Sequence, residues 1–162
     1  MGEDSIRPFI KDTEKGVFIL CRTSNPSAKD LQNKLTEGKP LFHQVAMLAK
    51  KLNNLDNIGL VIGATAPEEL SQIRNIVPEL PLLIPGIGAQ GGDLEHSVHV
   101  SNKTGVGLIN VSRDISFAGK MTSSDIYNAA KKYHQNIKFA HSQSTVLCPS
   151  TGPPIAQLWS HS

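Results

Sequence analysis

Four short apolar runs alternate with four amphipathic segments, and this alternation is the feature that most constrains the fold. The apolar runs cover residues 16–21, 58–62, 82–85 and 107–111. Each run is rich in β-branched residues and continuously hydrophobic, which is typical of a strand that is covered on both faces of a sheet. Strands that alternate with helices build parallel βα units. The sequence therefore predicts an α/β fold with a parallel sheet.

The segments between these runs have helical periodicity and recognisable ends. The first helix is expected over 40–53, where it opens with proline, and the third over 93–102. The second follows the sequence Thr-Ala-Pro-Glu at 65–68, which has capping-box spacing with proline in the first turn. The fourth begins near Ser123 and is expected to bury one stripe of its surface, made of Ile126, Tyr127, Ala130 and Tyr133.

Composition limits the partners of the chain. Its 162 residues suffice for one ordinary domain, and 16 basic against 14 acidic residues leave a net charge of only +2. So small a charge gives no field that favours nucleic acid or an acidic membrane. No apolar run reaches the roughly 18 residues of a membrane span, and the N-terminus lacks the features of a signal peptide. We expect no nucleic-acid partner, no membrane partner and a cytoplasmic location.

The cysteines and the C-terminal segment carry little chemistry. Cys21 lies inside an apolar run and Cys148 near the C-terminus, a spacing that fits neither a metal site nor a structural disulfide. Residues 1–140 are expected to form the folded domain. Residues 141–162 are rich in Ser, Thr and Pro without any period, which indicates a disordered or foreign tail. Trp159 belongs to this tail and is not expected in the core.

A glycine-rich loop over 86–92 follows the strand expected at 82–85, and Arg113 closely follows the strand expected at 107–111. In a parallel sheet the carboxyl ends of strands meet at one edge. Backbone N–H groups, the amide of Gln90 and the guanidinium of Arg113 can therefore converge on one anion, such as a phosphate. The alternative is that the glycines only shape a turn and Arg113 is a surface cation, and spacing alone leaves both interpretations open.

The segment 85–92, Pro-Gly-Ile-Gly-Ala-Gln-Gly-Gly, strongly resembles the seventh-strand motif of the orotidine 5′-phosphate decarboxylase family. Segments 17–26, 59–65 and 111–113 resemble the same family in the same order. The resemblance covers roughly residues 1–135. It is closest to the longer type found in some bacteria and protozoa, which also occurs fused in bifunctional UMP synthases. It implies the C-terminal half, strands five to eight, of a (β/α)8 TIM barrel, with the chain beginning at an internal methionine.

The resemblance also assigns a phosphate site. The glutamine and the arginine that bind the phosphate in the family correspond to Gln90 and Arg113. The family's backbone N–H donors correspond to Gly91, Gly92 and Ser112. The family converts orotidine 5′-phosphate (OMP) into UMP and CO2 in de novo pyrimidine biosynthesis. OMP and UMP are therefore the expected ligands.

Two further residues are assigned to the pyrimidine base by the same resemblance. Ser24 matches a serine that reads the amide edge of the ring, and Pro85 matches a proline that packs near it. Without the resemblance, Ser24 would be interpreted as an ordinary turn residue and Pro85 as the end of a strand.

The catalytic motif of the family, Asp-x-Lys-x-x-Asp with a further lysine, has no match in this chain. The nearest sequences, at 12–15 and 29–30, have the wrong spacing and follow no strand. We therefore expect no catalytic residue, an inactive isolated chain, and no cofactor. We expect no metal either, because His96 and His99 lack further ligands.

The missing half of the barrel suggests how the chain associates. Its expected partner is a second copy or the missing N-terminal half. The alternative function is a noncatalytic phosphate-binding half-barrel, or a fragment of a bifunctional UMP synthase.

Overall fold

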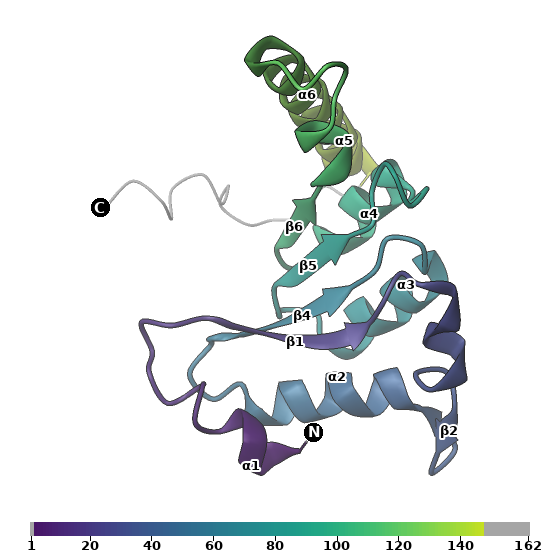
Figure 1. Cartoon of the computed structure of the whole chain (residues 1–162). Coiled ribbons are helices and arrows are strands. Elements are labelled where there is room, and N and C mark those ends of the chain that lie inside the picture. Colours follow the sequence, from purple (N-terminus) through teal and green to yellow (C-terminus); the bar gives the residue numbers. More distant parts are fainter. Residues whose placement is uncertain (1, 148–162) are drawn as a thin grey trace.

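The computed structural model describes residues 2–147, and its centre is a four-stranded parallel sheet (Figure 1). The strands follow one another across the sheet in chain order: β1 (Val17–Arg22), β4 (Ile58–Ile62), β5 (Leu82–Pro85) and β6 (Gly107–Asn110). Every neighbouring pair is parallel. The predicted α/β class is confirmed, and the strand bounds differ from the expected ones by only one residue at an end.

Four helices connect or follow these strands: α2 (Leu41–Leu52), α3 (Pro67–Ile76), α4 (Leu94–Ser101) and α6 (Ser123–Leu147). Smaller elements complete the described chain. They are α1 (Glu3–Ile6), the 3-10 helix η1 (Pro26–Asp30), the hairpin strands β2 (Leu35–Thr36) and β3 (Lys39–Pro40), and α5 (Arg113–Ser116). No helix in this part of the chain is long and apolar enough to cross a membrane.

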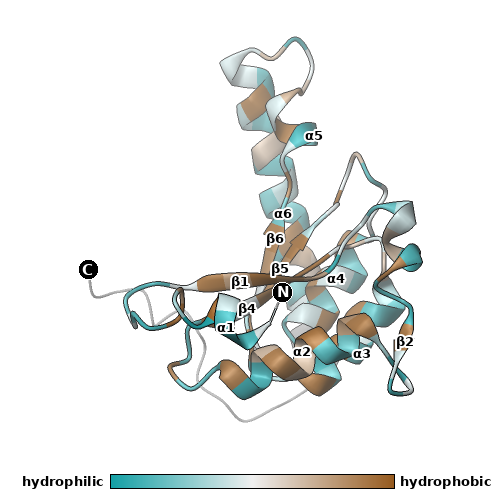
Figure 2. Cartoon of the chain, turned by 60° about the horizontal axis from the view of Figure 1, so that its bottom comes forward, coloured by the Kyte–Doolittle hydropathy of each residue, from teal (hydrophilic) through white to brown (hydrophobic). Residues whose placement is uncertain are grey.

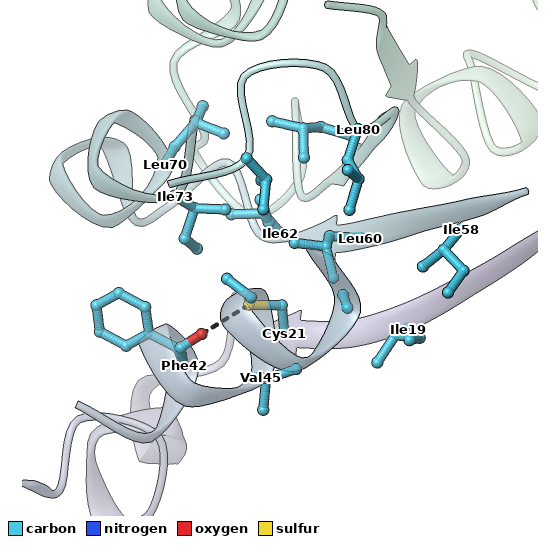
Figure 3. Close-up of a cluster of buried hydrophobic side chains, with 14 of the residues drawn as sticks. Ile19, Cys21, Phe42, Val45, Ile58, Leu60, Ile62, Leu70, Ile73 and Leu80 are labelled. Carbon is cyan, nitrogen blue, oxygen red and sulfur yellow. Dashed lines mark hydrogen bonds between the residues drawn. The ribbon is translucent and has the colours of Figure 1, made fainter. Parts of the chain in front are cut away.

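The hydrophobic core lies between one face of the sheet and the helices (Figure 3). Alternate strand residues point into it, among them Ile19 and Cys21 of β1, and helix residues such as Phe42 and Ile73 meet them there. Cys21 Sγ donates a hydrogen bond to the Phe42 carbonyl oxygen over 3.2 Å. Burial raises the pKa of the Cys21 thiol to about 12, so this cysteine is a core residue and not a nucleophile.

The opposite face of the sheet corrects our expectation that both faces are covered. Phe18 and Leu20 of β1 are 39% and 51% exposed, although they alternate along the strand with the buried residues Ile19 and Cys21. Leu108 of β6 faces the same side of the sheet and is 44% exposed. These strands are brown, and hence hydrophobic, in Figure 2. We call the surface formed by Phe18, Leu20 and Leu108 the open face. The strands are hydrophobic on both faces as expected, but residues 2–147 cover only one face of the sheet.

A buried arginine, which sequence reasoning missed, joins four of these elements. Arg74 of α3 is only 2% exposed, and burial lowers its pKa to about 10. Its guanidinium donates to five backbone carbonyl groups, those of Val77, Pro78, Leu80, Ser101 and Val106. It therefore ties the end of α3 to the end of α4 and to the segments that lead into β5 and β6.

Helix α6 corrects two further expectations. It continues past Ala140 to Leu147, because neither glycine nor proline interrupts the chain before Pro149. Tyr127, expected inside, is 63% exposed, whereas Ile126 and Tyr133 are partly buried. Tyr127 lies about 100° around the helix from Ile126 and so falls outside the packed stripe. The rest of the expected tail, with Cys148 and Trp159, lies outside the described residues.

Candidate functional site

A cavity of about 160 Å³ lies at the carboxyl ends of β1, β5 and β6. Parallel strands present their carboxyl ends at the same edge, which is where α/β proteins commonly bind ligands. The lining residues come from the ends of these strands and the segments that follow them: Ser24, Pro85, Gly86, Ile87, Ala89, Gln90, Asn110, Ser112 and Arg113. The structure thus brings together five of the seven predicted site residues. Gly91 and Gly92 do not line the cavity.

The central contact of the site joins two distant segments. Ser24 Oγ donates a hydrogen bond to Gln90 Oε1 over 2.6 Å. Gly86 makes room for this contact, because a Cβ at that position would lie 2.7 Å from Gln90 Oε1 and 3.2 Å from Ser24 Cβ. Its φ of +98° also favours glycine. The glycine after Pro85 is therefore needed for the shape of the site.

Neighbouring groups hold Ser24 in place. Thr65 Oγ1 donates to the Ser24 carbonyl oxygen over 2.9 Å, and a Cβ on Gly63 would lie 2.6 Å from Ser24 N. This contact corrects the predicted capping box: Ala66 occupies the N-cap of α3, and its side chain makes no capping bond. The Thr65 hydroxyl serves the segment after β1 instead. A functional side chain that is fixed by such supporting contacts needs little reorganisation on binding.

The N–H groups of Gly91 and Gly92, predicted as donors to a phosphate, make backbone hydrogen bonds in this structure. Gly91 N–H donates to the Gly88 carbonyl oxygen over 2.7 Å, and Gly92 N–H donates to that of Gly86 over 3.0 Å. A Cβ on Gly92 would lie 2.5 Å from the Cβ of Ala64. Both N–H groups are therefore used to close the loop, and these glycines shape the site without pointing donors into it.

Arg113 supplies the positive charge of the cavity. Its side chain is exposed, and no ion pair joins it to a carboxylate among residues 2–147. Ser112 Oγ lies 3.5 Å from Asn110 Oδ1, a long hydrogen bond on the same side of the cavity. A guanidinium with two parallel N–H donors is suited to bind a phosphate or a carboxylate in bidentate fashion.

Four lining residues were not predicted as members of the site: Gly86, Ile87, Ala89 and Asn110. Three of them belong to the glycine-rich loop, whose position in the sequence already indicated the site. Asn110 ends β6, three residues before Arg113. A polar residue at the carboxyl end of an apolar strand was the signal that could have identified it.

Other chemistry has little support in the described part of the chain. No group of three or more His, Cys, Asp or Glu side chains there could hold a metal ion. His96 Nε2 lies 3.1 Å from the Pro67 carbonyl oxygen, so its ring joins α4 to α3. Asp12 and Lys15 form an ion pair of 3.0 Å, but they precede β1 and so lie at the amino edge of the sheet, opposite the cavity.

The fold and the cavity define a parallel α/β protein with a polar cavity at the carboxyl edge of its sheet, the edge where proteins of this class commonly bind ligands. Residues 1–126 match the sequence profile of the orotidine 5′-phosphate decarboxylase / HUMPS family, and the chain belongs to this family.

Individual relatives agree with this assignment. The chain is 54% identical over 130 residues to the orotidine 5′-phosphate decarboxylase of Halorubrum lacusprofundi, a match that covers 76% of this chain and 47% of that protein. The solved OMP decarboxylase of Leishmania donovani is 36% identical, with a TM-score of 0.77 over 88% of this chain and 54% of that one. The UMP synthase of the same organism is 38% identical, with a TM-score of 0.76 over 87% and 31%. The chain spans about half the length of the curated relatives that it matches.

Proposed function

We propose that this chain supplies the phosphate- and base-binding part of an orotidine 5′-phosphate decarboxylase, which converts OMP into UMP and CO2. The observation that carries the proposal is the Ser24–Gln90 hydrogen bond, which lies in the same cavity as the guanidinium of Arg113, a group without an ion pair in the described part of the chain. Membership of the family supports the proposal independently of this geometry.

The polar groups of the cavity suit the two ends of a pyrimidine nucleotide. Gln90 accepts the hydrogen bond from Ser24 at Oε1, so both N–H groups of its Nε2 can donate to a phosphate beside Arg113. Ser24 donates its only hydroxyl proton to Gln90, so its oxygen can accept the imide N–H of a pyrimidine ring. Ser24 is thus proposed to contact the base, and Gln90 and Arg113 the phosphate.

The reacting carbon of OMP requires groups that this cavity does not contain. Decarboxylation leaves a carbanion, which needs fixed electrostatic stabilisation and a proton donor. Within residues 2–147, the cavity is lined by no lysine and no carboxylate. We therefore assign ligand binding to this chain and the proton transfer to groups outside it. The inactivity of the isolated chain stays a prediction.

The four βα units are proposed to correspond to strands five to eight of the barrel. Their motifs occur in the order of those strands, and the chain matches about half the length of its relatives. The open face would then lie inside the complete barrel, and the remaining strands would come from another polypeptide segment or from a second copy. The similarity to the UMP synthase of Leishmania donovani favours one alternative, that the decarboxylase part belongs to a bifunctional protein.

Replacement of Arg113 by alanine tests the proposed site. Loss of a charge-assisted contact is expected to lower UMP affinity by about tenfold to a hundredfold. Affinity for uridine, which has no phosphate, should stay unchanged. Both ligands are titrated by calorimetry against the wild type and Arg113→Ala.

The matched control is Arg7→Ala, because Arg7 is exposed at the C-cap of α1 and pairs with Glu3 away from the cavity. This variant should bind UMP as the wild type does. Equal losses for UMP and uridine in Arg113→Ala would show that Arg113 supports the fold and not the ligand, which would contradict the proposal.

A further inference from the structure

Asp114 and Tyr133 form a hydrogen-bonded pair directly behind the site. Tyr133 Oη of α6 donates to Asp114 Oδ2 of α5 over 2.7 Å, and both residues are partly buried. The hydrogen bond to the carboxylate raises the pKa of the Tyr133 hydroxyl to about 12. The hydroxyl therefore keeps the proton that makes this contact further into the alkaline range than an ordinary tyrosine does. The pair connects the helix that ends the described chain to the residue next to Arg113.

The same pair lies on the backbone of the glycine-rich loop. A Cβ on Gly88 would collide with Asp114 Oδ2 and would lie 2.6 Å from Tyr133 Oη. The Gly88 carbonyl oxygen in turn accepts the N–H of Gly91, which closes the turn that carries Gln90. The position of the pair is thus transmitted to Gln90 through one short backbone segment.

The pair also affects the charge of the cavity. Asp114 is the carboxylate nearest to Arg113 in sequence, and an ion pair between them would neutralise the guanidinium. No such ion pair occurs among residues 2–147, and the Asp114 carboxylate faces Tyr133 and Gly88 instead. Tyr133 therefore offers Asp114 a partner other than Arg113.

We infer that Asp114 and Tyr133 are positioning residues for the anion site, where they hold the glycine-rich loop against the turn of Arg113 and keep the Asp114 carboxylate away from it. The inference rests on the proposed function for its ligand, but not for its geometry. Neither residue lines the cavity.

Amide hydrogen exchange in Tyr133→Phe tests the geometry without any ligand. Loss of the hydroxyl should loosen the loop and speed the exchange of the Gly91 and Gly92 amides by about threefold to thirtyfold. The amide of Val77, which donates to the Ile73 carbonyl oxygen at the end of α3, should not change. Unchanged loop amides, or an equal acceleration of all three, would overturn the inference.

The control variant is Tyr127→Phe on the same helix. Tyr127 is exposed, and phenylalanine keeps the ring that Lys131 contacts at 5.9 Å. Loss of its hydroxyl should leave the exchange of the loop amides unchanged. Acceleration by this variant equal to that by Tyr133→Phe would assign the effect to the helix in general and contradict the inference.

Calorimetric titration with UMP tests the effect on the ligand. Tyr133→Phe should weaken UMP binding by about threefold to tenfold and leave uridine binding unchanged. In the Arg113→Ala background the same change should have a smaller effect, because only the part that acts through the loop on Gln90 remains. Equal effects in both backgrounds would overturn the link to Arg113. A wild type that binds no UMP would contradict the proposed function, and the exchange data would still decide the positioning of the loop.

Discussion

Gly86 sets the distance between Ser24 and Gln90, the two side chains on which the site depends. Its φ of +98° is rarely adopted by other residues, and a methyl group there would lie 2.7 Å from Gln90 Oε1. Gly86→Ala is expected to lower UMP affinity by about tenfold or more, since roughly 1–3 kcal/mol of backbone strain must be relieved by displacing the loop. Calorimetry measures the loss. Gly16→Ala is the control, because a Cβ on Gly16 has no neighbour within 4 Å, and equal UMP affinity in both variants would contradict this role for Gly86.

The sequence predicted which residues line the cavity where their position depends on the local motif, and their roles stay predictions. Gln90 and Arg113 follow strands in a recognisable motif, and both line the cavity. The roles of Gly91 and Gly92 depend on which carbonyl groups their N–H groups reach after the loop has closed. Thr65 likewise bonds to Ser24, which is 41 residues away. Neither type of contact has a signature in the local sequence.

At the scale of the elements, Arg74 is the residue on which the arrangement of α3, α4, β5 and β6 depends. Arg74→Met removes the donors of five backbone carbonyl groups, and a methionine side chain has none to replace them. We expect the free energy of unfolding to fall by about 2–4 kcal/mol, even though removal of the buried charge offsets part of the loss. Urea denaturation at fixed protein concentration measures the change. Arg7→Met on the surface should cost less than about 0.5 kcal/mol, and a similar small loss for Arg74→Met would refute the assignment.

The elements themselves were largely predictable, because hydrophobic period and strand length decide them locally. All four long helices and the four strands occur where the patterns indicated. The errors concern contacts beyond the pattern. The aromatic ring of Tyr127 favours the packed stripe, whereas its angle around α6 places the side chain in solvent. The Ser- and Thr-rich composition after Ala140 predicts the end of the fold there, whereas α6 continues because the chain has no helix-breaking residue before Pro149. The spacing of apolar residues in the sequence does not indicate the buried hydrogen bonds of Arg74.

At the scale of the whole molecule, the open face and the two sheet edges limit how the chain can exist alone. β1 and β6 are the outer strands of the sheet, so in the described structure each has one edge without a neighbouring strand. Unpaired backbone groups beside exposed apolar side chains favour association with another chain. The outer strands are hydrophobic in Figure 2, and their exposed side chains Phe18, Leu20 and Leu108 form the open face.

The chain is therefore expected to dimerise or form larger assemblies, and sedimentation velocity over a range of concentrations measures this. Leu20→Gln changes the most exposed of the three side chains that define the open face, and should shift the distribution toward monomer, because less apolar area is removed from water on association. Met47→Gln is the matched control: Met47 is 43% exposed on α2, on the other side of the sheet, and its replacement should leave the distribution unchanged. A wild type that sediments as a single monomer and unfolds cooperatively on heating would show that the open face is tolerated in water, and the expected association would be wrong.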